Sequence, residues 1–438
     1  MKRTELDELI RWKNSKDRKP LIIRGARQVG KTWLMKEFGS REYEQTVYIN
    51  FEKNKRMSSL FDEDFDVKRI LMGLQIEYGI TISADNTLIL FDEIQEAPAV
   101  LTSLKYFCED APEYHIIAAG SLLGVALHAG TSFPVGKVRF LDLYPLNYYE
   151  YLQALNENPL AELLRSGDWK MIYNFRAKYV NLLRQYYYIG GMPEAVLSFS
   201  NNPDFNTVRN IHYNILQAYQ QDFSKHAPPE IVPRIRLLWN SVPAQLAKEN
   251  KKFIYGLIKK GARAKDYESA LSWLTDCGLV YKVCRASKPA LPLIAYEDMS
   301  AFKLFVLDVG LLSTMGGIDV KSLIEGNRIF TEFKGALTEQ YVLQQLISKR
   351  SYQINYWTAE KASAEIDFLL QSGGAVFPLE VKAEENLQAK SLKVFCEKYQ
   401  SDLAVRTSMS DFRRTDRFIN VPLYAVSELN DVINSVRS

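Results

Sequence analysis

The chain has 438 residues, of which 47% are apolar and 24% are charged. This length exceeds one ordinary domain, and this apolar content excludes an intrinsically disordered protein. The 55 basic and 52 acidic residues give a net charge of +3, which neither requires nor excludes a nucleic-acid partner.

The chain shows no sign of export or membrane insertion. Residues 1–7 lack the apolar core of a signal peptide, and no apolar run approaches the roughly 20 residues that span a membrane. The cysteines are too sparse and too irregularly spaced for a disulfide framework or a zinc site: Cys108, Cys277, Cys284 and Cys396. We therefore expect a cytoplasmic protein with reduced thiols and no membrane contact.

A phosphate-binding loop is predicted near the N-terminus. Residues 19–24 have the pattern of a short buried strand, and residues 33–38 have the pattern of a helix start. The residues between them fit G-x-x-x-x-G-K-[ST] without a mismatch: Gly25, Ala26, Arg27, Gln28, Val29, Gly30, Lys31 and Thr32. Backbone N–H groups of such a loop point at phosphate oxygens, so we expect Lys31 on the β- and γ-phosphates and Thr32 on Mg²⁺.

A second motif follows a predicted buried strand at residues 87–91. Asp92 and Glu93 come directly after this apolar run, where a parallel strand delivers side chains to the edge of its sheet. We expect Asp92 to hold Mg²⁺ and Glu93 to act as the base for an attacking water. The alternative is an ordinary acidic loop. No Asn-Lys-x-Asp motif is present, which favours ATP over GTP.

Two further strands are predicted at residues 115–120 and 137–143. Ser121 follows the first of them, where its hydroxyl is expected to sense the γ-phosphate; a helix N-cap is the alternative. Arg24 and Arg139 are candidates to stabilise phosphate charge, with surface salt bridges as the simpler interpretation. Together these segments predict an open parallel α/β sheet with its ligand crevice at the strand C-termini.

These motifs resemble those of the bacterial and archaeal AAA family 14 ATPases, which carry a C-terminal domain of unknown function. The matching segments are Arg24–Thr32, Phe91–Gln95, Gly120–Ser121 and Leu143–Leu146. The resemblance covers the whole chain and implies an AAA+-type fold that binds ATP. It implies little about biological role.

Helical periodicity follows at residues 148–155, 168–188 and 206–223, which predicts a helical lid over the nucleotide. Within it, residues 190–195 resemble the Gly-x-Pro motif of signal-transducing ATPases, and this implies that Pro193 packs near adenine. The alternative is a helix that ends at the glycines and a new helix with Pro193 in its first turn.

A proline-dense segment, 226–233, predicts a domain boundary near residue 227. Helices at 234–249 and 266–276, then strands from residue 278, have the order of a winged helix with residues 265–275 in the recognition position. A basic cluster accompanies it and predicts DNA contact: Lys251, Lys252, Lys259, Lys260, Arg263 and Lys265. Solvated lysines on a spacer or a protein-docking module are the alternative.

The C-terminal segment contains a predicted β-hairpin, residues 364–370 and 376–382, around Gly373 and Gly374. If these glycines form a two-residue turn, Asp367 lies opposite Glu380. Two facing carboxylates repel each other unless a cation bridges them, which predicts a divalent metal site.

This layout resembles the PD-(D/E)xK nuclease motif, which implies that Asp367 and Glu380 hold Mg²⁺ and that Lys382 positions the water. Glu339 shares a helical face with apolar residues and is the predicted third metal ligand. The alternatives are an ordinary exposed strand, or a nuclease-like fold that binds without cutting.

The sequence thus predicts an α/β chain in which a P-loop NTPase parallel sheet with a helical lid precedes a winged-helix module and a C-terminal α/β nuclease-like domain. The predicted divisions are 1–150, 151–226, 227–315 and 316–438. The predicted function is Mg²⁺-dependent ATP hydrolysis coupled to DNA, with a metal-dependent nuclease domain. The main alternative is a nucleotide-switched regulator whose C-terminal domain never cuts and binds a protein partner or a second copy. A protein remodeller is disfavoured because no pore loop is evident.

Overall fold

The structure is a computed structural model that describes residues 1–121, 133–248, 252–321, 331–359, 364–385, 390–415 and 417–437. It divides into two compact units. The N-terminal unit comprises Lys2–Tyr144 and Asp276–Leu279, and the C-terminal unit comprises Met1, Pro145–Thr275 and Val280–Ser438. The boundaries predicted after residues 226 and 315 both fall inside the C-terminal unit.

The N-terminal unit contains a five-stranded sheet in the order β2-β3-β4-β1-β5, and each neighbouring pair is parallel. The parallel α/β sheet predicted from the sequence is therefore confirmed. Its strands are β1 (Leu21–Arg24), β2 (Gln45–Asn50), β3 (Thr87–Asp92), β4 (His115–Ala119) and β5 (Arg139–Asp142). Its helices are α1 (Glu5–Lys13), α2 (Lys31–Glu42), α3 (Ser59–Asp62), α4 (Val67–Tyr78) and α5 (Pro98–Asp110), with short 3-10 turns η1 (Lys55–Ser58) and η2 (Ile94–Glu96).

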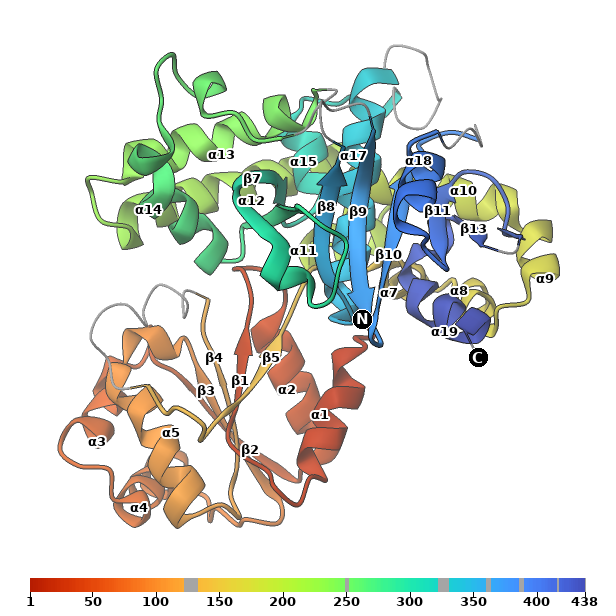
Figure 1. Ribbon diagram of the computed structural model, residues 1–438. Helices are drawn as coiled ribbons and strands as arrows, with labels where there is room; N and C mark the ends of the chain where they lie inside the picture. Colours follow the sequence, from red (N-terminus) through yellow and green to blue (C-terminus); the bar gives the residue numbers. More distant parts are fainter. Residues whose placement is uncertain are drawn as a thin grey trace. The chain divides into compact units, whose positions relative to one another are not determined.

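Strands β3 and β4 are buried along their whole length, as their continuous apolar runs require. Helices α1 and α2 lie on one face of the sheet, and α3, α4 and α5 lie on the other (Figure 1). Strand β2 was not predicted. Its alternation of polar and apolar residues suits its place at the sheet edge, where side chains are partly exposed.

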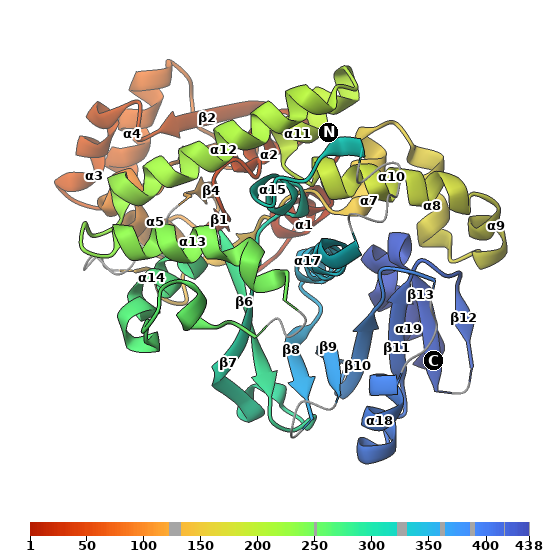
Figure 2. The same cartoon turned by 90° about the horizontal axis from the view of Figure 1, so that it is seen from above.

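The C-terminal unit contains an eight-stranded sheet in the order β12-β13-β11-β10-β9-β8-β6-β7. Figure 2 shows these strands in a row, with α17 over one face and α18 over the other. The strands are β6 (Val280–Ala286), β7 (Glu297–Val306), β8 (Gln353–Thr358), β9 (Glu365–Ser372), β10 (Ala375–Val381), β11 (Ala404–Ser408), β12 (Arg413–Arg414) and β13 (Phe418–Pro422).

The helices of this unit precede, interrupt and follow its sheet. They are α7 (Tyr148–Ala154), α8 (Asn158–Ser166), α9 (Trp169–Asn174), α10 (Arg176–Ile189), α11 (Pro193–Asn201), α12 (Phe205–His226), α13 (Val232–Leu246), α14 (Ala264–Asp276), α15 (Val309–Met315), α17 (Thr331–Lys349), α18 (Lys390–Tyr399) and α19 (Leu429–Arg437). Short 3-10 turns are η3 (Tyr255–Leu257), η4 (Leu293–Tyr296) and η7 (Leu423–Glu428). The α14 helix ends in the segment Asp276–Leu279, which belongs to the N-terminal unit.

One long helix was predicted over 168–188, and the structure instead has α9 and α10, with a break at Phe175. Each of the two helices has its own aromatic partner. Trp169 on α9 stacks on Phe412 with ring centroids 4.2 Å apart, and Tyr179 on α10 stacks on Tyr424 at 5.0 Å. Because of this break, both helices pack against aromatic residues of the C-terminal segment, Phe412 and Tyr424.

The predicted hairpin of β9 and β10 has the predicted register. Ser372 pairs with Ala375, and the antiparallel pairing continues to Phe368 with Leu379. The turn residues Gly373 and Gly374 have φ of 53° and 72°, the left-handed values that a type I′ two-residue hairpin turn requires at both positions.

The helices and hairpin predicted as a winged helix are present as α13, α14, β6 and β7, in that order. The hairpin does not stand alone, because β6 also pairs in parallel with β8 at Arg285 and Tyr356. The hairpin therefore continues the sheet of the C-terminal segment, and the winged helix stays a prediction.

Candidate functional site

The predicted phosphate-binding loop joins the end of β1 to the start of α2, as the motif requires. Three of its residues have left-handed backbone: Gly25 with φ of 147°, Gln28 with 67° and Gly30 with 96°. A Cβ on Gly25 would lie 2.2 Å from the carbonyl oxygen of Leu143, so only glycine fits there. Alternating handedness of this kind turns successive N–H groups toward one centre and makes an anion-binding loop.

Lys31 is buried and turns its ammonium back onto the loop. Its Nζ donates to the carbonyl oxygens of Gly25 at 2.9 Å and Ala26 at 2.8 Å. Burial lowers the pKa of Lys31 to about 8, although the nearby carboxylates of Glu93 and Asp92 act in the opposite direction. A desolvated ammonium held only by neutral carbonyls is poised to take an anionic partner.

Asp92 ends β3 and is only 1% exposed. Its Oδ2 accepts hydrogen bonds from Thr32 Oγ1 at 2.7 Å and from Tyr48 Oη at 2.8 Å. Burial and the hydrogen bond to Asp92 raise the pKa of Tyr48 to about 12, so Tyr48 stays a donor. The structure thus brings the two predicted Mg²⁺ ligands together, and their hydroxyl and carboxylate oxygens are of the kind that Mg²⁺ prefers.

Glu93 lies beside this pair, with a left-handed backbone at φ of 53°. Its carboxylate accepts a hydrogen bond from Gln95 Nε2 at 2.6 Å and a longer one from Ser121 Oγ at 3.4 Å. The predicted base and the predicted γ-phosphate sensor are therefore in contact. The alternative of Ser121 as a helix N-cap concerns residues 122–132, which lie outside the described residues.

Sequence reasoning missed Tyr48 and Gln95 as members of the site. Gln95 is two residues from Glu93, within the segment Phe91–Gln95 that carries the family resemblance, and this proximity was the available signal. In the part of the chain that the structure describes, the buried Oε1 of Gln95 has no hydrogen-bond partner. Tyr48 comes from the strand that the sequence did not predict.

Arg24 forms the salt bridge that was the simpler interpretation. Its Nε and Nη2 donate to the two carboxylate oxygens of Asp142 at 2.8 and 3.0 Å, and its guanidinium lies over the ring of Phe140. Arg139 is exposed on β5. Charge stabilisation by either arginine stays a prediction.

Pro193 belongs to the C-terminal unit, so its contact with adenine stays a prediction. It stands in the first turn of α11, as the alternative interpretation expected. The preceding glycines are explained by packing: a Cβ on Gly190 would lie 2.1 Å from Asp308 Oδ1, and one on Gly191 would lie 2.0 Å from the Leu146 carbonyl. Asp308 accepts a hydrogen bond from the Gly191 N–H at 2.6 Å, and burial raises the pKa of this carboxyl.

The predicted C-terminal site has its carboxylates close to cations and N–H groups. Asp367 Oδ2 accepts from the N–H of Val381 at 2.7 Å, and Glu380 Oε1 lies 3.0 Å from Lys382 Nζ. Glu339, on the buried face of α17 as predicted, lies 3.6 Å from the ammonium of Lys303.

Lys303 was not predicted to belong to this cluster. It lies on β7, is fully buried, and also contacts Glu365 Oε1 at 2.5 Å. Burial opposes its charge, but Glu339, Glu365 and Asp367 together raise the pKa of Lys303 above its ordinary value. Within the described ranges, no group of three or more His, Cys, Asp or Glu side chains is arranged to hold a metal. Metal binding by Glu339, Asp367 and Glu380 stays a prediction.

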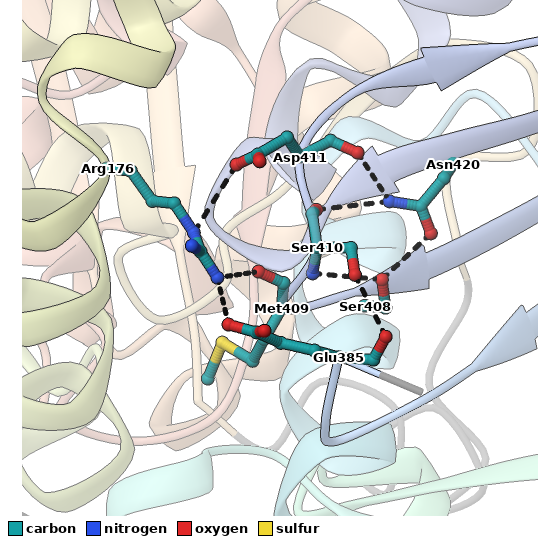
Figure 3. A network of polar contacts seen from close by, with 7 residues as sticks. All are labelled: Arg176, Glu385, Ser408, Met409, Ser410, Asp411 and Asn420. Carbon is teal, nitrogen blue, oxygen red and sulfur yellow. Dashed lines mark hydrogen bonds and ion pairs between the residues drawn. The ribbon is translucent and has the colours of Figure 1, made fainter. Parts of the chain in front are cut away.

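The segment that follows β10 is held by Arg176 of α10 (Figure 3). The guanidinium contacts the carboxylate of Glu385, donates to the carbonyl of Met409 at 3.1 Å and lies 3.3 Å from Asp411 Oδ1. Asn420 makes further hydrogen bonds in the same region. Its side-chain amide donates to the carbonyl oxygens of residues 410 and 411, and its Oδ1 accepts a hydrogen bond from the hydroxyl of residue 408 (Figure 3). Arg176 therefore joins α10 to the segments that follow β10 and β11.

The predicted basic cluster is exposed where the structure describes it. Its described members precede or begin α14: Lys252, Lys259, Lys260, Arg263 and Lys265. Lys251 lies outside the described residues. Among the helices that are described, none has the length and apolar character needed to cross a bilayer.

Comparison with known families identifies three segments. Residues 17–152 match a family described as an AAA domain. Residues 180–322 and 334–426 match families described only as domains of unknown function, DUF8612 and DUF4143. The AAA part of the resemblance is confirmed, and residues 17–152 form a nucleotide-binding AAA-type ATPase domain. No curated protein matches the chain.

Several solved structures are distantly similar. A Walker-type ATPase of Pyrococcus abyssi is 15% identical with a TM-score of 0.45, over 72% of this chain and 95% of its own. The Orc1 protein of Aeropyrum pernix, solved in complex with DNA, is 12% identical with a TM-score of 0.29, over 72% and 91%. PCH-2 of C. elegans is 17% identical with a TM-score of 0.27, over 46% and 62%. With TM-scores this low, none of them bears on function.

Proposed function

We propose that this chain, whose residues 17–152 form an AAA domain, is a Mg²⁺-dependent ATPase that works as a nucleotide-driven switch. The observation that carries the proposal is the hydrogen bond of 2.7 Å between Thr32 and Asp92, which joins the phosphate-binding loop to the acidic end of β3. Around it, Lys31, Glu93 and Ser121 supply the remaining groups that phosphoryl transfer to water requires.

Each residue has a separate task in this proposal. The loop N–H groups and Lys31 hold the phosphates and offset their charge, and Thr32 and Asp92 hold Mg²⁺. When bound, the metal neutralises charge on the β- and γ-phosphate oxygens. Glu93 accepts the proton of the attacking water, and Ser121 steadies Glu93 and the γ-phosphate. Hydrolysis of this type depends on placing the water and on charge stabilisation, so small displacements of Glu93 matter.

The test is Glu93→Gln. This variant is expected to bind ATP as the wild type does and to lose at least about 100-fold in turnover, the contribution usual for a general base. Glu96→Gln is the matched control, because it makes the same change at the end of the 3-10 turn that Glu93 precedes. Wild-type turnover in Glu93→Gln would contradict the assigned role.

We propose DNA as the macromolecular partner. The support is the exposed basic cluster around the start of α14, where phosphates can approach several lysines. Charge reversal at Lys259 and Lys260 should weaken DNA binding and reduce its salt dependence, measured by anisotropy of a labelled duplex. Equal binding by the wild type and this variant would favour a protein-docking role for the module.

For the C-terminal domain, the non-cleaving alternative fits better than the nuclease. A buried ammonium lies among the carboxylates where a metal nuclease would hold its ion. The ATP cycle would then control binding by this domain and not cleavage.

A further inference from the structure

The acid cluster of the C-terminal unit contains its own cation. Lys303 is the charged residue in an otherwise apolar stretch of β7, between the buried Phe302 and Leu304. Lysine is almost never fully buried unless it is paired. Its ammonium lies 2.5 Å from Glu365 and 3.6 Å from Glu339, which come from β9 and α17.

Asp367 and Glu380 have contacts of their own, although Glu380 Oε2 is buried without a hydrogen-bond partner among the described residues. Asp367 accepts the N–H of Val381, and Glu380 pairs with Lys382. The ring of Tyr356 on β8 lies 5.0 Å from the Lys303 ammonium and closes another side of it. A divalent ion would have to enter next to a buried positive charge, and at such short range the repulsion is strong.

We propose that the ammonium of Lys303 is the permanent cation of this cluster, so that the C-terminal domain binds no divalent metal there and does not cleave nucleic acid by a metal-dependent route. Glu339, Glu365, Asp367 and Lys303 then have a structural task. They tie β7 of the predicted winged-helix hairpin to β9 and α17 of the predicted nuclease-like domain, so that the two modules move as one.

This inference concerns the C-terminal unit alone and goes beyond the proposed ATPase activity. ATP turnover, measured on the same preparations, reports on the ATPase proposal separately. Either proposal can therefore fail while the other holds.

The test is a titration of the nucleotide-free, full-length chain with Mn²⁺, following the electron paramagnetic resonance signal of free Mn²⁺. The wild type and Asp367→Asn are expected to take up the same amount of Mn²⁺, because the cluster offers no site to lose. Asparagine keeps an acceptor for the Val381 N–H, so the substitution leaves the strand pairing in place. Uptake of one Mn²⁺ by the wild type that disappears in Asp367→Asn would overturn the inference.

Lys303→Met sharpens the test. Methionine has a similar length and no charge, so the variant is expected to gain one Mn²⁺ site that Glu365→Gln removes again. If Lys303→Met fails to fold, as circular dichroism would show, the comparison of Mn²⁺ uptake by the wild type and by Asp367→Asn still tests the inference.

In parallel, single-stranded, duplex and branched DNA are incubated with Mn²⁺ and the wild-type chain. No cleavage is expected, and cleavage lost in Lys382→Ala would overturn the inference.

Discussion

The two units each hold a cluster of carboxylates, and the clusters differ in what surrounds them. In the N-terminal unit, Asp92 and Glu93 receive hydrogen bonds from neutral hydroxyl and amide groups. In the C-terminal unit, Glu339 and Glu365 face the ammonium of Lys303. Asp92 and Glu93 thus have neutral hydrogen-bond donors, whereas Lys303 places a cation directly against Glu339 and Glu365 and offsets one of their two negative charges.

The two buried lysines differ in the same way. Lys31 donates to backbone carbonyls, and burial lowers its pKa to about 8. Lys303 faces carboxylates, which outweigh burial and raise its pKa. Lys31 is thus placed to bind an anionic ligand, whereas Lys303 forms ion pairs with carboxylates of its own unit, and this difference separates a ligand site from a structural one.

The largest expected effect is that of Lys31→Ala. The variant should lose MgATP binding and all measurable turnover, because the phosphates lose their one buried cation in the loop. Equilibrium binding of a fluorescent ATP analogue measures it. Arg41→Ala, which removes a charge from the exposed end of the same helix, should bind normally; comparable loss in both variants would point to a damaged fold.

The stability of methionine variants contrasts the two lysines directly. Lys303→Met should cost about 3–5 kcal/mol of unfolding free energy, because it leaves the buried carboxylate of Glu339 without its cation. Lys31→Met should be neutral or stabilising in the nucleotide-free chain, since it removes a desolvated charge. Urea unfolding monitored by circular dichroism measures both. Equal destabilisation by the two substitutions would contradict the proposed difference between Lys31 and Lys303.

Gln95→Leu tests the neutral donors of the first cluster. Loss of one hydrogen bond to a carboxylate, about 1.5–3 kcal/mol, should lower kcat by about 10- to 100-fold. KM should stay near the wild-type value, because Gln95 positions Glu93 and contacts no phosphate in this account. Steady-state kinetics separate the two constants, and a rise in KM alone would mean that Gln95 acts in binding.

The pH dependence follows from Lys31. Its pKa in the nucleotide-free chain is about 8, below the ordinary 10.5, so the folded chain binds fewer protons than the unfolded chain between these values. Stability should therefore rise with pH across this window. Bound MgATP restores the charge, so binding at pH 8 should take up about half a proton. Calorimetry in buffers of different ionisation enthalpy measures the uptake, which should be absent in Lys31→Met.

The smallest expected effect is that of Arg176→Gln at the contact beyond β10 (Figure 3). The side chains of Arg176 and Asp411 are each 30% exposed, so solvent screens their interaction. The loss should be about 1 kcal/mol or less. Urea unfolding measures it, and a loss as large as that of Lys303→Met would mean that this contact, and not the buried cluster, holds the unit together.

The parts of the site that were predictable are those encoded locally. The loop Gly25–Thr32 and the acids Asp92 and Glu93 are short motifs next to strong apolar strands. The register of β9 and β10 followed from Gly373 and Gly374, because a two-residue turn fixes which residues pair.

The parts that were missed depend on contacts between distant segments. Lys303 meets Glu339 and Glu365 only because the β6–β7 hairpin joins the sheet through β8, and no local pattern encodes that pairing. A signal did exist, since a single lysine inside an apolar strand must find a buried partner. Strand β2 was missed because its polar alternation at an edge is weak, and Tyr48 was missed with it.

The most direct test of the central claim is the number of Mn²⁺ ions bound per chain with and without a non-hydrolysable ATP analogue. We predict one ion in the presence of nucleotide, lost in Asp92→Asn and retained in Asp367→Asn, and none without nucleotide. An ion that binds without nucleotide and is lost in Asp367→Asn, or a nucleotide-dependent ion that survives Asp92→Asn, would contradict the account.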